Sequence, residues 1–308
     1  MNLQSNPAKT AVLLLAHGSP DSVEQVPEFL LRVTGGRPLP PAVVDEVKHR
    51  YSLIGRSPRT ELTLKQGELL ARELKSLVYV GMRNWRPFID DVLRTMTSDG
   101  VEHAVAICLA PQNSRTSVGL YRSDLTSNQG TPFTIDFVES WHDHPLLIKA
   151  FAEKLRTGWH RACREMGTQK APIIFTAHSV PERTIVEGDP YESQAKETAA
   201  LVAREAALTA EDWTFAFQSQ GMSGGAWLGP RVEDTILRLK EKGHRGVFLQ
   251  PIGFLCDHVE VLYDIDIAFK QFAEKQGMRL WRAESLNDSP LLAAALADIA
   301  RSRLVAAP

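Results

Sequence analysis

The sequence has few cysteines, and their spacing is unlike that of a metal cluster. Cys108, Cys163 and Cys256 lie far apart and form no Cys-x-x-Cys motif. Structural zinc sites and iron–sulfur clusters need ligands at short, regular spacings, and disulfide frameworks need paired cysteines. We therefore expect no iron–sulfur cluster and no tightly bound cofactor, and we expect each cysteine to be a small buried side chain.

Long hydrophobic runs and a surplus of one charge are also missing. The 308 residues contain no apolar run close to the roughly 20 residues that cross a bilayer, and the N-terminus lacks the pattern of a secretory signal. Lysine and arginine total 35 against 37 aspartate and glutamate, so the net charge of −2 gives no basic surplus for nucleic acid. These absences predict a cytoplasmic protein with no integral membrane segment and no nucleic-acid partner.

What the sequence does have is a regular alternation of short apolar runs and amphipathic stretches. The runs predict strands at residues 11–16, 76–81, 103–111, 134–138, 172–177, 213–218, 246–252 and 278–282. The stretches between them predict helices, among them residues 63–74, 86–98, 145–166, 191–207, 231–242 and 258–275. Nearly continuous apolar strands separated by helices are typical of parallel sheets covered on both faces. The predicted fold class is α/β.

Two segments of the chain resemble each other. Residues 11–20 (AVLLLAHGSP) and 172–181 (PIIFTAHSVP) each contain an apolar run, then Ala-His, then a proline three places after the histidine. This repeat predicts two similar Rossmann-like modules, each a four-stranded parallel sheet, with a cleft between them beyond the strand ends. The expected modules are residues 1–168 and 169–289, with a helix at 290–308 that packs back on the first.

Two titratable residues follow predicted strands, where such folds bind their ligands. The imidazole of His178 can titrate near neutral pH and bind a metal, although a turn histidine bonded to the backbone is the alternative. Read as one helix, the segment after residue 252 places Asp257, Glu260 and Asp264 on a single narrow face. Such a face is either solvated or neutralised by a cation. His258 falls on the apolar side, which suggests a supporting role.

A glycine-rich loop at residues 218–230 carries a further candidate. It ends near Trp227 and has neither the lysine of a P-loop nor the GxGxxG dinucleotide pattern. A phosphate cradle is therefore weakly supported, and an aromatic side chain on a loop suits a flat apolar ligand equally well.

Several of these segments resemble the motifs of one family. Residues 175–181 (FTAHSVP), 218–221 with 227–230 (QSQG and WLGP) and 251–264 (PIGFLCDHVEVLYD) look like the three diagnostic motifs of ferrochelatases, and 15–20 (LAHGSP) and 50–58 (RYSLIGRSP) are similar too. The resemblance implies a chelatase-like fold, with His178 and Glu260 as catalytic and metal-contacting residues. It implies porphyrin contacts by His17, Arg50, Tyr51, Ser57 and Tyr121, and support from Asp264, Trp227 and His258.

The resemblance also bears on the substrate. Residues 29–41 contain no extended apolar lip of the kind found in membrane-associated protoporphyrin enzymes, so the chain is most similar to the soluble bacterial coproporphyrin III type, although His17 stands where that type usually has tyrosine. The implied function is insertion of Fe²⁺, a substrate, into coproporphyrin III in haem biosynthesis by a monomer. Alternatives are a protoporphyrin IX ferrochelatase, a cobalt chelatase, and a non-catalytic haem or metal carrier.

Overall fold

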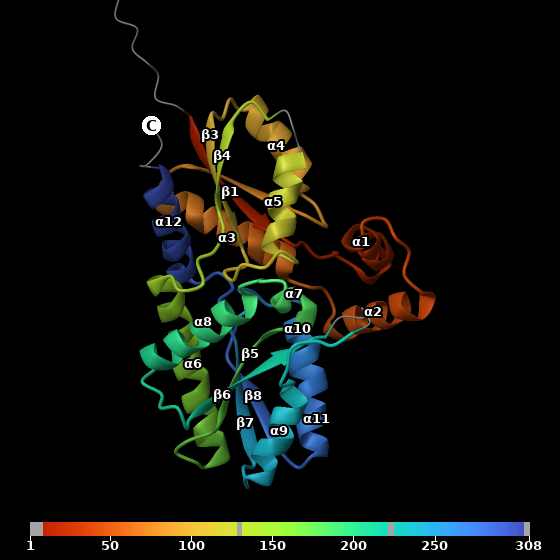
Figure 1. The fold of residues 1–308 in the computed structure, drawn as a ribbon, viewed down its shortest axis with the longest axis vertical. Coiled ribbons are helices and arrows are strands. Elements are labelled where there is room, and N and C mark those ends of the chain that lie inside the picture. Colours follow the sequence, from red (N-terminus) through yellow and green to blue (C-terminus); the bar gives the residue numbers. More distant parts are fainter. Residues whose placement is uncertain (1–8, 128–130, 221–224, 305–308) are drawn as a thin grey trace, which may run out of the picture.

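The computed structural model describes residues 9–127, 131–220 and 225–304, which form two parallel sheets flanked by helices (Figure 1). The first sheet has the order β2-β1-β3-β4, and its strands in chain order are β1 (Thr10–Ala16), β2 (Leu77–Met82), β3 (His103–Cys108) and β4 (Thr134–Val138). The second has the order β6-β5-β7-β8, with β5 (Ile173–His178), β6 (Trp213–Gln218), β7 (Gly246–Pro251) and β8 (Arg279–Arg282). All strand pairs are parallel. The predicted fold class is confirmed.

The two sheets share one topology. In each, the chain leaves the first strand for a neighbour on one side (β2 or β6) and then returns to a neighbour on the other side (β3 or β7). Ligands of doubly wound sheets bind beyond the carboxyl ends of the strands at such a reversal. His17 directly follows β1, and His178 is the last residue of β5. The repeat in the sequence therefore places these two histidines at equivalent points of the two sheets.

Helices connect the strands. In chain order they are α1 (Val26–Val33), α2 (Pro41–Ile54), α3 (Arg59–Leu74), α4 (Ile89–Ser98), α5 (Val118–Ser127), α6 (Pro145–Met166), α7 (Glu182–Val186), α8 (Tyr191–Glu205), α9 (Val232–Glu241), α10 (Val259–Leu262), a π-helix (Asp264–Phe269), α11 (Lys270–Lys275) and α12 (Pro290–Leu304). In the described part of the chain, none of them combines the length and the apolar character needed to span a membrane.

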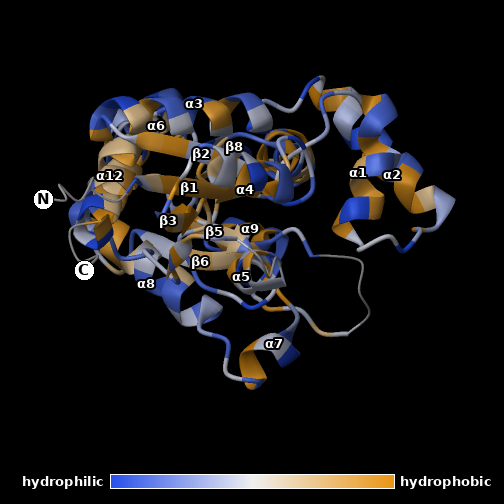
Figure 2. Ribbon diagram, turned by 90° about the horizontal axis from the view of Figure 1, so that it is seen from above, coloured by the Kyte–Doolittle hydropathy of each residue, from blue (hydrophilic) through white to orange (hydrophobic). Residues whose placement is uncertain are grey.

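Helices α1 and α2 form an arm at the side of the molecule (Figures 1 and 2). The sequence did not predict α2, because its apolar face is weak and only Tyr51 is buried in it. Pro41 begins α2 at the one helical position where a missing N–H costs nothing. The arm carries Arg50 toward the second half of the chain, so its placement matters for the site.

The segment that follows β7 differs from the single helix predicted at residues 258–275. His258 has extended backbone (φ −164°) and caps α10, so Asp257 lies before the helix rather than on its face. The N–H of Ala268 then bonds the carbonyl of Tyr263, five residues back, which gives the π-helical turn. The prediction of three carboxylates on one helical face is therefore wrong. Glu260 lies in α10 and Asp264 begins the π-helix, whereas the Asp257 carboxylate accepts hydrogen bonds from Ser285 and Asn287.

The main hydrophobic core joins both halves of the chain. Buried side chains of β1 (Leu14), β5 (Phe175), α6 (Phe151) and α12 (Leu296) belong to one cluster. Helix α12 packs against α3 and α6. The outer faces of the first and second sheets are covered separately, by α4 with α5 and by α9 with the π-helix and α11. The two sheets are thus held together by a shared layer of helices.

Candidate active site

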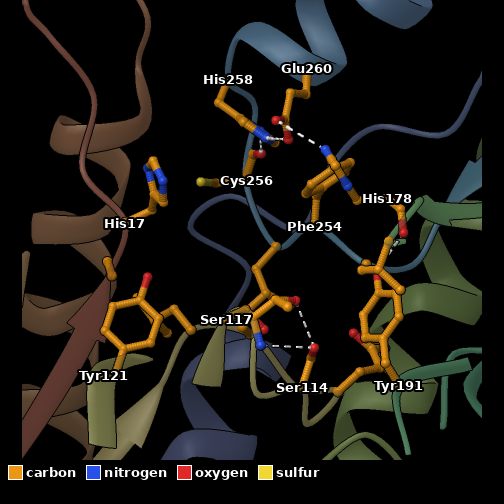
Figure 3. A pocket seen from close by; sticks show the side chains of 18 of the residues that line it. His17, Ser114, Ser117, Tyr121, His178, Tyr191, Phe254, Cys256, His258 and Glu260 are labelled. Carbon is orange, nitrogen blue, oxygen red and sulfur yellow. Dashed lines mark hydrogen bonds and ion pairs between the residues drawn. The ribbon is translucent and has the colours of Figure 1, made fainter. Parts of the chain in front are cut away.

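A cavity of about 450 Å³ lies beyond the carboxyl ends of β1 and β5. His17 and Tyr121 stand on one side of it, and His178 and Glu260 lie across from them (Figure 3). Both halves of the chain contribute to the lining, which combines apolar side chains with a few polar ones. This mixture is usual for a cavity that buries a largely apolar ligand and orients it by specific contacts.

His178 points its ring into the cavity from the end of β5. Its Nδ1 lies 2.5 Å from the carbonyl oxygen of Ser179, and its Nε2 lies 3.5 Å from Oε1 of Glu260. A carbonyl oxygen only accepts hydrogen bonds, so Nδ1 carries the proton and a neutral His178 presents a lone pair at Nε2. The hydroxyl of Tyr191 donates to the carbonyl of His178 at 2.9 Å and holds the strand end in place.

Glu260 is shared by two histidines. Its Oε2 lies 3.2 Å from Nε2 of His258, whose Nδ1 lies 2.9 Å from the carbonyl oxygen of Cys256. His258 is 1% exposed, whereas the side chains of His178 and Glu260 are 30% and 35% exposed. The buried histidine thus positions the carboxylate, and the carboxylate and His178 face the cavity. The burial of His258 agrees with its predicted place on the apolar side, and its supporting role stays a prediction.

The electrostatics of these three groups differ although they are neighbours. Burial alone would lower the pKa of His178, but the Glu260 carboxylate outweighs burial and raises it. Burial would raise the pKa of Glu260, but both histidines hold it well below its ordinary value. For His258, burial and the charge of Arg59 lower the pKa despite the contact with Glu260. The cluster therefore contains an ionised carboxylate, one readily protonated imidazole and one that resists protonation.

The opposite wall is built on the turn after β1. Nδ1 of His17 lies 3.2 Å from the carbonyl oxygen of Gly18, and burial lowers the pKa of His17 to about 4. The imidazole is therefore neutral at physiological pH. Gly18 adopts φ +81°, and a Cβ there would lie 2.6 Å from Cβ of Trp85, so this turn requires glycine. Tyr121, 6% exposed on α5, also lines this wall.

Asp264 lies one turn beyond Glu260, and its carboxylate accepts a hydrogen bond from the hydroxyl of Ser219. Nη1 of Arg50, from the arm, lies 3.6 Å from the same carboxylate. Burial raises the pKa of Asp264 to about 6 against the opposing effects of Ser219 and Arg50. The structure therefore pairs Arg50 with Asp264 and Glu46, and Arg50 does not line the cavity.

Two other residues predicted to contact porphyrin lie behind the wall. Tyr51 is 3% exposed, and its hydroxyl lies 3.1 Å from the hydroxyl of Ser19, where it supports the turn after His17. Ser57 is also 3% exposed, and its buried hydroxyl has no hydrogen-bond partner in the described part of the chain. Neither is among the residues that line the cavity.

The glycine-rich loop contributes one aromatic side chain to the cavity lining. Trp227 lines it, next to Pro181, with which it forms an isolated antiparallel bridge. Residues 221–224 of this loop lie outside the described residues. Trp227 therefore brings an aromatic side chain to the cavity, and its contact with a flat ligand stays a prediction.

Several lining residues were not singled out from the sequence. Tyr191 and Gln112 are almost fully buried, and Gln112 donates to Thr198 and to the carbonyl of Ile252 across the two halves. Arg59, the first residue of α3, brings a positive charge to the lining. The Gly-Asp-Pro-Tyr turn before α8 is a sequence signal for Tyr191, and Gln112 ends residues 109–112 (LAPQ), which resemble the same family. No comparable signal marks Arg59.

The fold and the cavity define a class. Among solved structures, the sirohydrochlorin chelatase SirB from Bacillus subtilis subspecies spizizenii, in complex with cobalt, is similar over 96% of this chain and 94% of its own, with a TM-score of 0.55 at 10% identity. The chain therefore has a chelatase-like fold.

Sequence comparison narrows this class. A ferrochelatase from Acidobacterium capsulatum is 54% identical over 96% of this chain and 95% of its own length. A coproporphyrin III ferrochelatase from Geobacillus sp. is 35% identical over 96% and 98%. The family model described as Ferrochelatase matches residues 9–304, and the chain belongs to the ferrochelatase family of metal-inserting enzymes.

Proposed function

We propose that this enzyme inserts Fe²⁺ into coproporphyrin III, with His178 and Glu260 as catalytic residues. The observation that carries the proposal is the His178–Glu260–His258 cluster on one wall of a cavity whose other wall presents a neutral His17. A flat macrocycle between the walls would have a histidine on each face. Carboxylate and imidazole are suitable ligands for Fe²⁺.

The cluster suits a reaction that releases protons. Insertion converts a free porphyrin and Fe²⁺ into an iron porphyrin and two protons, which come from two pyrrole N–H groups. Nε2 of a neutral His178 has a lone pair for the first of these, and Glu260 stabilises the imidazolium that forms.

The second proton has an acceptor beside this cluster. Burial raises the pKa of Asp264 to about 6, so this carboxylate accepts a proton more readily than Glu260 or His258 does. Glu260 also faces the cavity, where it can guide the metal. Asp264 adds a second carboxylate beyond it, in contact with Arg50.

The choice of coproporphyrin III rests on the resemblance in residues 29–41 and on the name of the Geobacillus relative. The substrate carries four propionates, and protoporphyrin IX carries two.

The test is anaerobic Fe²⁺ insertion with coproporphyrin III and protoporphyrin IX in parallel. We expect a higher kcat/KM for coproporphyrin III. A preference for protoporphyrin IX would reject the substrate, and turnover with neither porphyrin under clean reducing conditions would reject the function. Parallel reactions with Co²⁺ test the cobalt alternative.

A further inference from the structure

The N-terminal residue of α3 presents an unpaired cation to the cavity. Arg59 is the sole lysine or arginine among the described residues that line it. In the described part of the chain, Arg59 has no ion pair and no side-chain hydrogen bond. Its neighbours in sequence are occupied: Arg56 pairs with Asp21 at 3.7 Å, and Arg50 pairs with Glu46 and Asp264. Among the described residues that line the cavity, Arg59 is thus a cation without an ion pair.

The charge of Arg59 reaches both walls of the cavity. After burial, Arg59 is the next cause that lowers the pKa of His17, to about 4, and the pKa of His258. Burial raises the pKa of Cys256 to about 11, and Arg59 opposes that rise. The positive charge of Arg59 therefore acts on groups from β1, from the segment after β7 and, through Tyr121, from α5.

A ligand that fills this cavity must compensate the positive charge of Arg59. A flat macrocycle displaces water, and a guanidinium that loses water without gaining an anion is left strongly destabilised. A carboxylate is the natural partner, because a guanidinium can bind both of its oxygens. The anionic groups of a porphyrin are its propionates. A propionate at the inner edge of the ring would therefore be the partner of the Arg59 guanidinium.

We propose that Arg59 binds a propionate carboxylate of the substrate inside the cavity and thereby selects for porphyrins with carboxylates on every ring. This inference rests on the proposed function. Coproporphyrin III has one propionate on each of its four pyrroles, so every edge that enters brings a carboxylate to Arg59. Protoporphyrin IX has propionates on two adjacent pyrroles, and when these face solvent its apolar vinyl edge lies against the guanidinium.

The test measures binding of metal-free porphyrins, which does not depend on iron insertion. Fluorescence titration gives Kd for coproporphyrin III and protoporphyrin IX with wild type, Arg59→Leu, Arg59→Gln and Arg59→Lys. Arg56→Leu is the matched control, because this neighbouring arginine is exposed and does not line the cavity. Circular dichroism checks the fold of each variant, and Arg59→Gln and Arg59→Lys serve if the leucine variant does not fold.

We expect Arg59→Leu and Arg59→Gln to weaken coproporphyrin III binding by about 10- to 100-fold, the effect of one charge-assisted hydrogen-bonded pair. Protoporphyrin IX should change by less than about threefold, Arg59→Lys should recover part of the loss, and Arg56→Leu should bind as wild type does. In turnover, the loss should lie in KM rather than kcat.

An unchanged Kd for coproporphyrin III, or an equal loss with both porphyrins, would overturn the inference. These results are separable from failure of the proposed function. If the enzyme inserts iron but the Arg59 variants bind porphyrin as wild type does, only the inference about Arg59 is rejected. If the Arg59 variants bind coproporphyrin III more weakly but the protein inserts no iron, only the proposed function is rejected.

Discussion

Glu260 joins two histidines from different elements: its Oε1 lies 3.5 Å from Nε2 of His178, and its Oε2 lies 3.2 Å from Nε2 of His258. Each imidazole is oriented by a backbone carbonyl at Nδ1, so both Nε2 atoms point at one carboxylate. The geometry fixes ring orientations before any substrate arrives, which is what a positioned acid–base group requires.

Replacing His178 with alanine should separate chemistry from binding. We expect Fe²⁺ insertion to fall by about 100-fold or more, the usual contribution of a positioned general base. Porphyrin affinity should change little, because the other wall and the aromatic side of the cavity are intact. Turnover in a stopped assay measures iron insertion, and fluorescence titration measures porphyrin affinity. If the variant keeps near-normal turnover after the signal of iron-free controls is subtracted, His178 is not the base of this reaction.

The pKa of His178 should depend on Glu260. Because the carboxylate raises this pKa against burial, Glu260→Gln should lower it. Wild-type kcat/KM should increase as pH rises through the raised pKa, where the imidazole becomes neutral. In Glu260→Gln, the remaining turnover should show that rise at lower pH. NMR titration of the imidazole gives the pKa directly, and an identical pKa in both proteins would contradict the assigned coupling.

His17 should contact the iron of the product from the opposite face. Its pKa of about 4 keeps the ring neutral, and its Nδ1 contact with Gly18 leaves Nε2 free to bind a metal. His17→Ala should therefore change the absorption spectrum of the bound iron porphyrin, with added imidazole restoring it in part. If the spectrum of the variant matched that of wild type, axial contact by His17 would be ruled out.

Arg282 should matter for stability rather than for proton transfer. Its guanidinium bonds both carboxylate oxygens of Asp266, at 2.6 and 2.7 Å, and lies 3.3 Å from Asp257. Arg282→Met keeps the stem and leaves two carboxylates without their cation. We expect a loss of about 2–3 kcal/mol in the free energy of unfolding, measured by urea denaturation. A loss below about 0.5 kcal/mol would show that solvent replaces the pair.

The sequence predicted the strands because they depend on local patterns. Local position made His178 and Glu260 candidates, and the family resemblance supplied their roles. Short aliphatic runs defined each strand within a few residues, and His178 and Glu260 follow such runs. The one over-long prediction, residues 103–111, arose because the strand ends at Cys108 while apolar Leu109 and Ala110 continue into the cavity lining. A hydrophobic run does not distinguish a strand from a buried loop.

What the sequence did not predict depended on backbone turns and on contacts distant in sequence. Asp257 was placed on the helical face of Glu260 because helical periodicity was extended through His258, whose backbone is extended. Arg50 meets Asp264 only because the arm reaches across to the π-helix. Periodicity likewise gives no reason why Arg59, at the start of a surface helix, should face the cavity.

The shared core has a thermodynamic consequence. Since side chains of β1, β5, α6 and α12 form one cluster, neither sheet can lose its packing while the other keeps it. The molecule should melt in a single calorimetric transition whose van't Hoff and measured enthalpies agree. Two separate transitions would show that the sheets unfold independently despite the cluster that they share.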